Sequence, residues 1–177
     1  MTVSYIDEND QTVIVTIDAT PSEGVRFDGK FMHRAKLMNL SFNNASFVAC
    51  NLRMSTMDDA EAIGVDFTSA SLIGVNARRA RLCKSIFHRT RLRLTHFEHA
   101  DLSGADLSGA EIYETHFEDC DLRGAIMLAD NLDNAYFTGA RFDKRSVWPE
   151  GFNPLEYGAI LVEDENHLAP VEDADVR

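Results

Sequence analysis

An apolar residue stands at every fifth position from residue 27 to residue 142, and this spacing limits the possible folds more than any other feature of the chain. All of these positions, called centres below, are apolar, and nine of the eleven Phe residues fall on them. An α-helix repeats every 3.6 residues and a strand every two, so neither element produces this period. The spacing therefore predicts a repeat architecture in which each five-residue unit places one large side chain in the core.

A second inward position lies two before each centre. Eleven of these positions hold Ala, and only Lys30 and Asp130 are charged. Residues i and i−2 of extended backbone share a face, so a large centre and a small partner both point inward. Seven of the ten Gly stand two positions after a centre, where a corner with positive φ suits them. Each unit is predicted to be one short extended side followed by one corner.

The number of sides in a coil follows from an internal repeat. The segments 95–105 and 115–125 are identical at eight of eleven positions, with an offset of twenty. Four five-residue units therefore make one coil, and centres that differ by twenty in number stack on one another. The predicted aromatic core consists of two ladders that interdigitate across a dry interior, namely Phe27, Phe47, Phe67 and Phe87 on one side and Phe97, Phe117 and Phe137 on the other.

Units such as ADLSG and CDLRG resemble the A(D/N)Lxx consensus of pentapeptide-repeat proteins, and the resemblance covers residues 25–144. It implies an all-β fold, a right-handed quadrilateral parallel β-helix of about six four-sided coils. Two exceptional inward residues need an explanation within such a coil. We expect Lys30 to extend to solvent. A buried Asp130 would need a water, a capping backbone N–H or Arg145 as its partner.

The chain is predicted to form four segments. Residues 1–24 form an N-terminal β cap, because strands at Thr2–Ile6 and Thr12–Ile17 flank a polar turn. Residues 25–145 form the β-helix. Residues 146–162 form a C-terminal cap in which Trp148, Phe152 and Tyr157 plug the last coil, and Asn153-Pro154 begins a short helical turn that Gly158 ends. Residues 163–177 form an acidic, disordered tail.

Charge is distributed unevenly over a chain whose net charge is −12. Residues 77–94 carry +7 and no acidic residue, and we call their cationic side chains the basic belt: Arg78, Arg79, Arg81, Lys84, Arg89, Arg91 and Arg93. Two interpretations remain open. The basic belt either docks an acidic partner or phosphate groups, or it is a solvated surface balanced by the acidic coils beside it. The overall negative charge argues against direct nucleic-acid binding.

The acidic coils favour a second hypothesis. Resemblance to quinolone-resistance members of the family implies an acidic rod that imitates duplex DNA and binds DNA gyrase. The imitation phosphates would be Glu98, Asp101, Asp106, Glu111, Glu114, Glu118, Asp119 and Asp121. Several of these Asp residues also fill the polar position of the repeat consensus, and the basic belt interrupts the negative surface. The hypothesis rests on analogy with the family.

A third hypothesis is a metal-binding or redox module. His96 and His116 differ by one coil, with Glu98 and Glu118 stacked beside them, and two imidazoles with two carboxylates are a ligand set for Zn²⁺. Repeat duplication alone also explains the recurring THFE segment, so we predict no metal and no other cofactor. Cys83 lies between Arg81 and Lys84, which would lower its pKa, although an ordinary exposed thiol is the simpler interpretation.

The leading functional prediction is a non-catalytic, protein-binding scaffold of bacterial type whose partner the sequence does not identify. A filled coil has no pocket for catalysis, and the chain has no phosphate loop, nucleophile elbow or zinc-protease motif. The absence of long apolar runs predicts a cytoplasmic protein without a membrane segment. Ile160–Val162 form a short apolar stretch that either packs on the coil or pairs with a second copy, because some family members are dimers.

Overall fold

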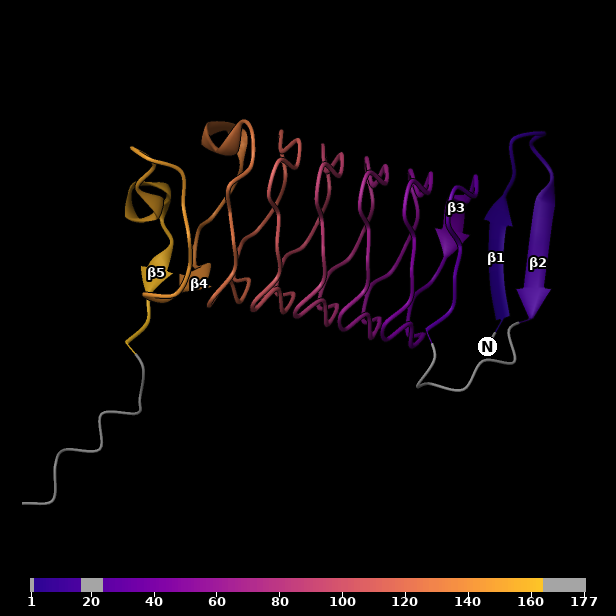
Figure 1. Cartoon of the computed structure of the whole chain (residues 1–177), viewed down its shortest axis with the longest axis horizontal. Coiled ribbons are helices and arrows are strands. Elements are labelled where there is room, and N and C mark those ends of the chain that lie inside the picture. Colours follow the sequence, from indigo (N-terminus) through magenta and orange to yellow (C-terminus); the bar gives the residue numbers. More distant parts are fainter. Residues whose placement is uncertain (1, 17–23, 164–177) are drawn as a thin grey trace, which may run out of the picture.

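The computed structural model describes residues 2–16 and 24–163, which form a solenoid wound from successive coils (Figure 1). Parallel bridges join residues whose numbers differ by twenty, from Arg26 with Ser46 to Asp121 with Arg141, with one exception described below. Successive bridges follow one another at every fifth position, so each coil makes four of them. The β-helix-type solenoid and the length of its coil agree with the prediction from sequence.

The core is a continuous column of the predicted inward side chains. All of the centres are buried, and so are all but four of the inward positions that precede them by two. The rings of Phe27, Phe47, Phe67 and Phe87 stack in one ladder, with centroids 4.7–5.5 Å apart. The rings of Phe97, Phe117 and Phe137 stack in a second ladder, with centroids 5.2–5.6 Å apart.

Small polar residues at the inward positions form hydrogen bonds that the sequence analysis did not predict. Thr115 Oγ1 donates to the carbonyl oxygen of Leu92 at 2.8 Å, and Cys120 Sγ donates to that of Phe97 at 2.7 Å. The same donation to a carbonyl of the preceding coil recurs at Cys50, Ser55, Ser85, Thr90 and Thr95. Each of these seven inward donors thus has a partner, which is the usual condition for placing a polar group in the core.

The corners adopt the left-handed backbone conformation. Every residue two positions after a centre, from Gly29 to Gly124, has a positive φ, and most of these residues are not Gly. Left-handed backbone is strained for residues with a Cβ. A ladder hydrogen bond holds each corner from Gly29 to Asp119, as at Arg34, whose N–H donates to the carbonyl oxygen of Arg53 at 2.9 Å. At Gly124 the N–H donates to the side chain of Asp143 instead. Glycine is therefore favoured at the corners but not required there.

The prediction that Asp130 points inward is wrong. Its backbone bridges Glu111, one position short of the regular offset, and its side chain is exposed. The short 3₁₀ helix η1 (Leu132–Asn134), which follows Asn131 at φ 64°, adds one residue to the next side. The regular offset of twenty then returns, since Tyr136 bridges His116. This local shift turns the carboxylate to solvent while the next centre, Leu132, remains buried. Arg145 pairs with Asp143 and not with Asp130. Lys30 is exposed, as expected.

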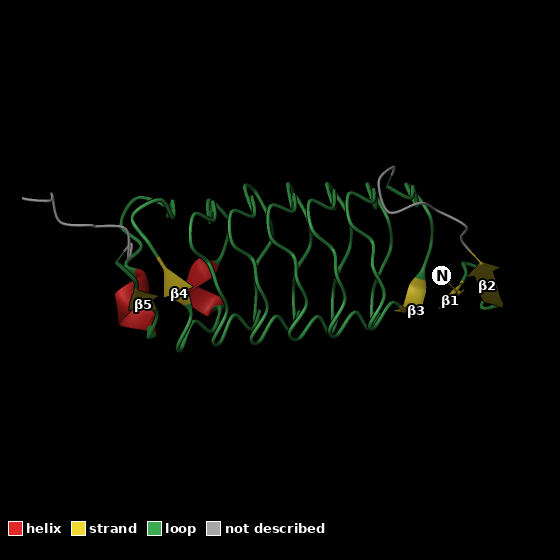
Figure 2. Cartoon of the chain, turned by 90° about the horizontal axis from the view of Figure 1, so that it is seen from below, coloured by secondary structure: helices red, strands yellow, loops and turns green. Residues whose placement is uncertain are grey.

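An antiparallel hairpin lies against the first coil. Strands β1 (Thr2–Ile6) and β2 (Thr12–Thr16) pair with each other, and β1 also pairs antiparallel with β3 (His33–Lys36) (Figure 2). The side chain of Val3 is fully buried in the core. The hairpin lies at the residues where the sequence predicts strands, although Ile17 falls outside the described residues.

The other end of the solenoid carries an aromatic cluster. The rings of Trp148, Phe152 and Tyr157 contact the ring of Phe137 edge-on. Helix η2 (Pro154–Tyr157) begins at Asn153, whose side chain accepts a hydrogen bond from the N–H of Leu155, and ends at Gly158 with φ 82°. The short helical turn therefore has the predicted first and last residues.

The chain continues beyond η2 in a short parallel ladder. Strand β5 (Ile160–Leu161) pairs with β4 (Arg141–Phe142), so the backbone of the apolar stretch packs on the last coil. Residues 164–177, which hold nearly all of the predicted tail, lie outside the described residues. Within the described part of the chain, no helix has both the length and the apolar character needed to cross a membrane.

Candidate interaction surface

The outer walls carry all seven residues of the basic belt, but the coil distributes them around the solenoid. Arg81 and Arg91 lie on different walls, in the bridge columns of Glu61 and Ser71. Arg79 and Lys84 have positive φ and therefore lie at corners. The basic belt consequently encircles the solenoid and does not form one flat face.

Ion pairs with neighbouring coils neutralise more than half of the basic belt. Arg79 donates both Nε and Nη2 to the carboxylate of Asp59, at 2.8 and 2.7 Å, and this hydrogen bonding lowers the pKa of Asp59. The other three pairs are Arg78–Glu98 at 3.1 Å, Arg81–Glu61 at 2.6 Å and Arg93–Glu111 at 3.8 Å. Three of the four pairs join residues one full coil apart, so an offset of twenty between opposite charges is a sequence signal for them.

The remaining members of the basic belt, Lys84, Arg89 and Arg91, form no ion pair with any residue that the structure describes. All three are exposed, and Ile86, at the start of the next five-residue side, lies between Lys84 and Arg89 in the chain. We call Lys84, Ile86, Arg89 and Arg91 the open basic surface. Its three cations are the members of the basic belt that form no ion pair with a described residue, although the backbone of Arg91 bridges that of Glu111.

Glycine corners make room for the open basic surface. A Cβ at Gly104 would lie 3.7 Å from Lys84 Cγ, and a Cβ at Gly109 would lie 3.7 Å from Arg89 Cγ. The aliphatic parts of both side chains therefore lie beside bare backbone of the next coil. A hollow of about 440 Å³ borders Lys84 and Gly104, and another of about 490 Å³ borders Arg89 and Gly109. Both hollows are surface depressions, as the filled core requires.

The eight predicted imitation phosphates do not gather on one wall. Asp106, Glu111 and Asp121 belong to three different bridge columns. Three of the carboxylates stabilise corners by accepting the N–H two positions later, at 3.0 Å for Asp101, 2.9 Å for Asp106 and 3.1 Å for Asp121. This bonding explains the recurring Asp of the repeat by local structure.

The other five imitation phosphates are, with one exception, also engaged. Glu98 and Glu118 bond to histidines, and Asp119 lies 3.7 Å from His99. Glu111 pairs with Arg93. Of these five, only Glu114 has no ion pair with a residue that the structure describes. A surface that imitates DNA by its free carboxylates would therefore be small.

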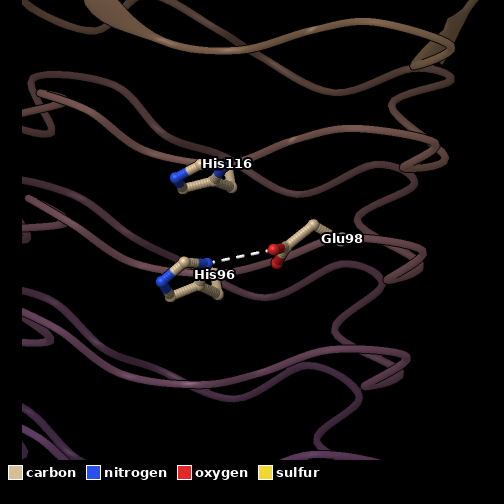
Figure 3. A group of neighbouring side chains, drawn as sticks. All are labelled: His96, Glu98 and His116. Atoms are coloured by element: carbon tan, nitrogen blue, oxygen red, sulfur yellow. Dashed lines mark hydrogen bonds and ion pairs between the residues drawn. The ribbon is translucent and has the colours of Figure 1, made fainter.

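The histidine cluster is compact, as Figure 3 shows. The rings of His96 and His116 stack with centroids 4.5 Å apart and planes at 15°. In each repeat Nδ1 of the histidine lies 3.0 Å from Oε1 of the glutamate two positions later, Glu98 or Glu118. Ligand atoms of His96, Glu98 and His116 all lie within 4.8 Å of one another. The structure thus brings together three of the four residues that the sequence suggested as metal ligands, and Glu118 lies beside His116 outside this group.

The three cysteines are free thiols. Arg81 and Lys84 lower the pKa of Cys83 as expected, but burial and the nearby charge of Asp101 outweigh them, so the pKa of this thiol is raised overall. Burial also raises the pKa of Cys50, to about 11, and that of Cys120. None of the three thiols is set up as a nucleophile at neutral pH.

A comparison with protein families matches residues 63–98 and 90–127 to the model of Pentapeptide repeats, in eight copies. No curated protein matches the chain. Among solved structures, a pentapeptide repeat protein from the thylakoid lumen of Arabidopsis thaliana is 21% identical with a TM-score of 0.51, and the match covers 51% of this chain and 63% of that one. The likeness supports the same fold.

Two further solved structures resemble the chain more weakly. QnrB1, a plasmid-mediated fluoroquinolone resistance protein, is 18% identical with a TM-score of 0.45, and the match covers 68% of this chain and 56% of that one. HetL of Nostoc sp. strain PCC 7120, involved in heterocyst differentiation regulation, is 18% identical with a TM-score of 0.30, over 78% and 88% of the two chains. The chain thus spans less than two thirds of the Arabidopsis protein and of QnrB1.

Proposed function

Since residues 63–127 of this chain are pentapeptide repeats, we propose that the protein is a non-catalytic scaffold that binds another protein through its outer walls. The observation that carries the proposal is the filled core, in which every centre is buried. Side chains at the outward positions are then the ones available for recognition. In this proposal the scaffold is a right-handed, four-sided β-helix of about six coils, capped by the hairpin and by the aromatic cluster.

The partner in this proposal is acidic and binds the open basic surface. Lys84, Arg89 and Arg91 have no carboxylate partner among the described residues, whereas Arg78, Arg79 and Arg81 are paired with adjacent coils. Uncompensated charge steers association and gives specificity, while charge already paired within the protein contributes little of either. Ile86 adds exposed apolar area between two of these cations.

The test is partner capture from a lysate of the source cells with charge-neutralised variants. The double substitution Arg89→Gln/Arg91→Gln removes two unpaired cations and is expected to abolish capture of a wild-type partner. The control Arg79→Gln/Arg81→Gln removes two paired cations, so the net charge of the protein changes equally, and it should retain the partner. Thermal melting checks that both variants fold. Equal capture by both variants, or equal loss from both, would refute the assignment of the open basic surface.

A second proposal is DNA mimicry directed at DNA gyrase. It is supported by carboxylates that stack one coil apart, since Asp101 bridges Asp121, and Glu98 and Glu118 repeat at the same offset. The arginines at positions 78, 79 and 81 interrupt this acidic surface one coil earlier. A supercoiling assay with the purified protein at micromolar concentration tests the idea. Inhibition of gyrase or protection from a quinolone would support gyrase mimicry. The absence of both effects would exclude it.

We also propose that the scaffold is a protein of the bacterial cytoplasm and that it forms a homodimer through its C-terminal segment. The side chains of Ile160 and Leu161 are 53% and 44% exposed although their backbone pairs with the last coil. Exposed apolar side chains on an edge strand favour association with a second copy. Light scattering of the full chain should give twice the monomer mass, and Ile160→Lys should give the monomer.

A further inference from the structure

We propose that His96, Glu98 and His116 form a binding site for one divalent transition-metal ion on the outer wall of the solenoid, with Glu118 beside His116 as a further candidate ligand. The site is independent of the open basic surface, and its ligands come from two successive coils. The chemistry of the ligand set points to Zn²⁺ or a neighbouring metal in the first transition series. Imidazole nitrogen with carboxylate oxygen suits such ions, whereas Mg²⁺ and Ca²⁺ prefer all-oxygen sites.

The backbone of two successive coils places the four side chains. His96 and His116 bridge each other directly, so their side chains leave the same wall one coil apart. Each glutamate stands two positions after its histidine, on the same face of the chain, and its Oε1 lies 3.0 Å from the histidine Nδ1. This separation is close to the spacing of two ligand atoms around one bound metal ion. A cation placed there replaces the proton that now lies between the two atoms.

Two buried carboxylate oxygens supply the second observation. Oε2 of Glu98 and Oε2 of Glu118 are shielded from solvent, and neither accepts a hydrogen bond from any described residue. Arg78 Nη2 already holds the other oxygen of Glu98 at 3.1 Å. Shielded oxygens of a carboxylate are costly when they have no donor or cation beside them. Each glutamate thus has one oxygen without a hydrogen-bond donor among the described residues, and Glu98 belongs to the group whose ligand atoms lie within 4.8 Å of one another.

The ligand side chains are partly shielded from solvent, and 20% of the Glu98 side-chain surface is accessible. The two imidazoles are only partly exposed, with 30% and 27% of their side-chain surface accessible, so a bound ion would exchange some but not all of its water for protein ligands.

The stacking of the rings sets one requirement for binding. The lone pair of Nδ1 lies in the plane of the imidazole, so one ion cannot meet both lone pairs while the two rings stay parallel. At least one ring must tilt. The ring of His116 also stacks on Tyr136, with centroids 4.6 Å apart. Metal binding is therefore expected to shift the NMR resonances of the Tyr136 ring, although Tyr136 is not a ligand.

The experiment is a calorimetric titration of the tag-free, chelator-treated full chain with Zn²⁺ alone. We expect one ion per chain and no binding of Mg²⁺. Either His96→Asn or His116→Asn should weaken Zn²⁺ binding by at least about tenfold, since even changes to residues that only orient the ligands weaken metal sites by about 10–100-fold. The matched control is His99→Asn, which removes an exposed imidazole that also faces a carboxylate, Asp119 at 3.7 Å, and should bind like the wild type.

Folding is checked by circular dichroism, and Glu98→Gln serves as a second variant because it preserves the size of the side chain. Binding lost in the His96, His116 and Glu98 variants but kept in the His99 variant supports the site. No stoichiometric Zn²⁺ binding to the wild type, equal binding by His96→Asn, or equal weakening by His99→Asn would overturn it. An unchanged Tyr136 spectrum on saturation with Zn²⁺ would overturn it as well.

Discussion

The ring of Phe87 meets the ring of Phe97 edge to face, with centroids 6.0 Å apart and planes at 78°. Phe87 ends one aromatic ladder and Phe97 begins the other. The two ladders therefore meet in the middle of the solenoid, where the stack crosses from one side of the interior to the other. Edge-to-face contacts of this kind add to the stabilisation from burial itself.

Phe87→Ala is expected to destabilise the protein by about 3–5 kcal/mol, because it leaves a cavity at the junction of the ladders. Chemical denaturation of wild type and variant measures the difference. The control is Leu155→Ala, whose side chain is 53% exposed and whose removal should cost no more than about 0.5 kcal/mol. A loss below about 1 kcal/mol for Phe87→Ala would contradict a core that is closely packed at this point.

Two glycines with similar φ angles should respond differently to alanine. A Cβ at Gly24, where φ is 60°, would lie 2.0 Å from the carbonyl oxygen of Asn44, which is backbone and has little freedom to move. Gly24→Ala should therefore cost about 1–3 kcal/mol, as overpacking does. At Gly109, where φ is 66°, the nearest atom is Arg89 Cγ at 3.7 Å. Gly109→Ala should cost at most about 1 kcal/mol, because only backbone strain remains.

Thermal and chemical unfolding of the two variants, each compared with wild type, give this comparison directly. Corners occupied by Ala49, Met54 and Leu94 already show that side chains are tolerated where space allows. Equal destabilisation by the two substitutions would mean that φ, and not contact with the neighbouring coil, decides where glycine is needed.

Asp143 should make the last coil sensitive to acid. Although burial disfavours its charge, hydrogen bonds from the Arg145 side chain and from the N–H groups of Arg145 and Gly124 hold the pKa of this carboxyl below its usual range. A carboxyl with a lowered pKa stabilises the fold above the pKa of the unfolded chain, about 4. That stabilisation disappears as the pH falls through the lower folded-state value.

Asp143→Asn is accordingly expected to lower the free energy of unfolding by about 1.5–3 kcal/mol at pH 7, the range for hydrogen bonds to charged groups. The gap between variant and wild type should narrow when both are acidified to about pH 3, which urea titrations at the two pH values measure. The control is Glu150→Gln, which changes an exposed side chain. Its free energy of unfolding should equal that of the wild type at both pH values. A gap for Asp143→Asn that stays constant with pH would rule out the carboxylate charge as its source.

The three cysteines are expected to differ in how fast they are alkylated. Burial and the charge of Asp101 raise the pKa of the partly exposed Cys83 thiol, so its alkylation at pH 7 should be slower than that of a small free thiol and should accelerate as the pH rises. Cys50 and Cys120 are buried and should react only after unfolding. Mass spectrometry after iodoacetamide treatment should find one modified site in the native protein and three in denaturant. Fast modification of Cys83 at pH 7 would contradict the raised pKa.

Much of this architecture was predictable from sequence because the rules that govern it are local. The alternation of inward and outward residues, the regular offset between coils and the preference for glycine at corners each depend on a few neighbouring residues. The same holds for the C-terminal turn, where Asn153, Pro154 and Gly158 act within one helical turn. The candidate metal ligands were also predictable as a group, since His96 and His116 differ by one coil.

The sequence by itself therefore determined the period, the core positions and the length of a coil. The tertiary structure decided where the backbone departs from strict repetition and which charges are compensated. Asp130 turned outward because exposing one carboxylate is less costly than burying it, and a shift of one position achieves this while Leu132 stays in the core. Arg79 and Arg81 form ion pairs, whereas Arg89 and Arg91 form none with a described residue, because pairing depends on which side chains meet across adjacent coils. That is a property of contacts between distant segments, which a one-dimensional pattern does not contain.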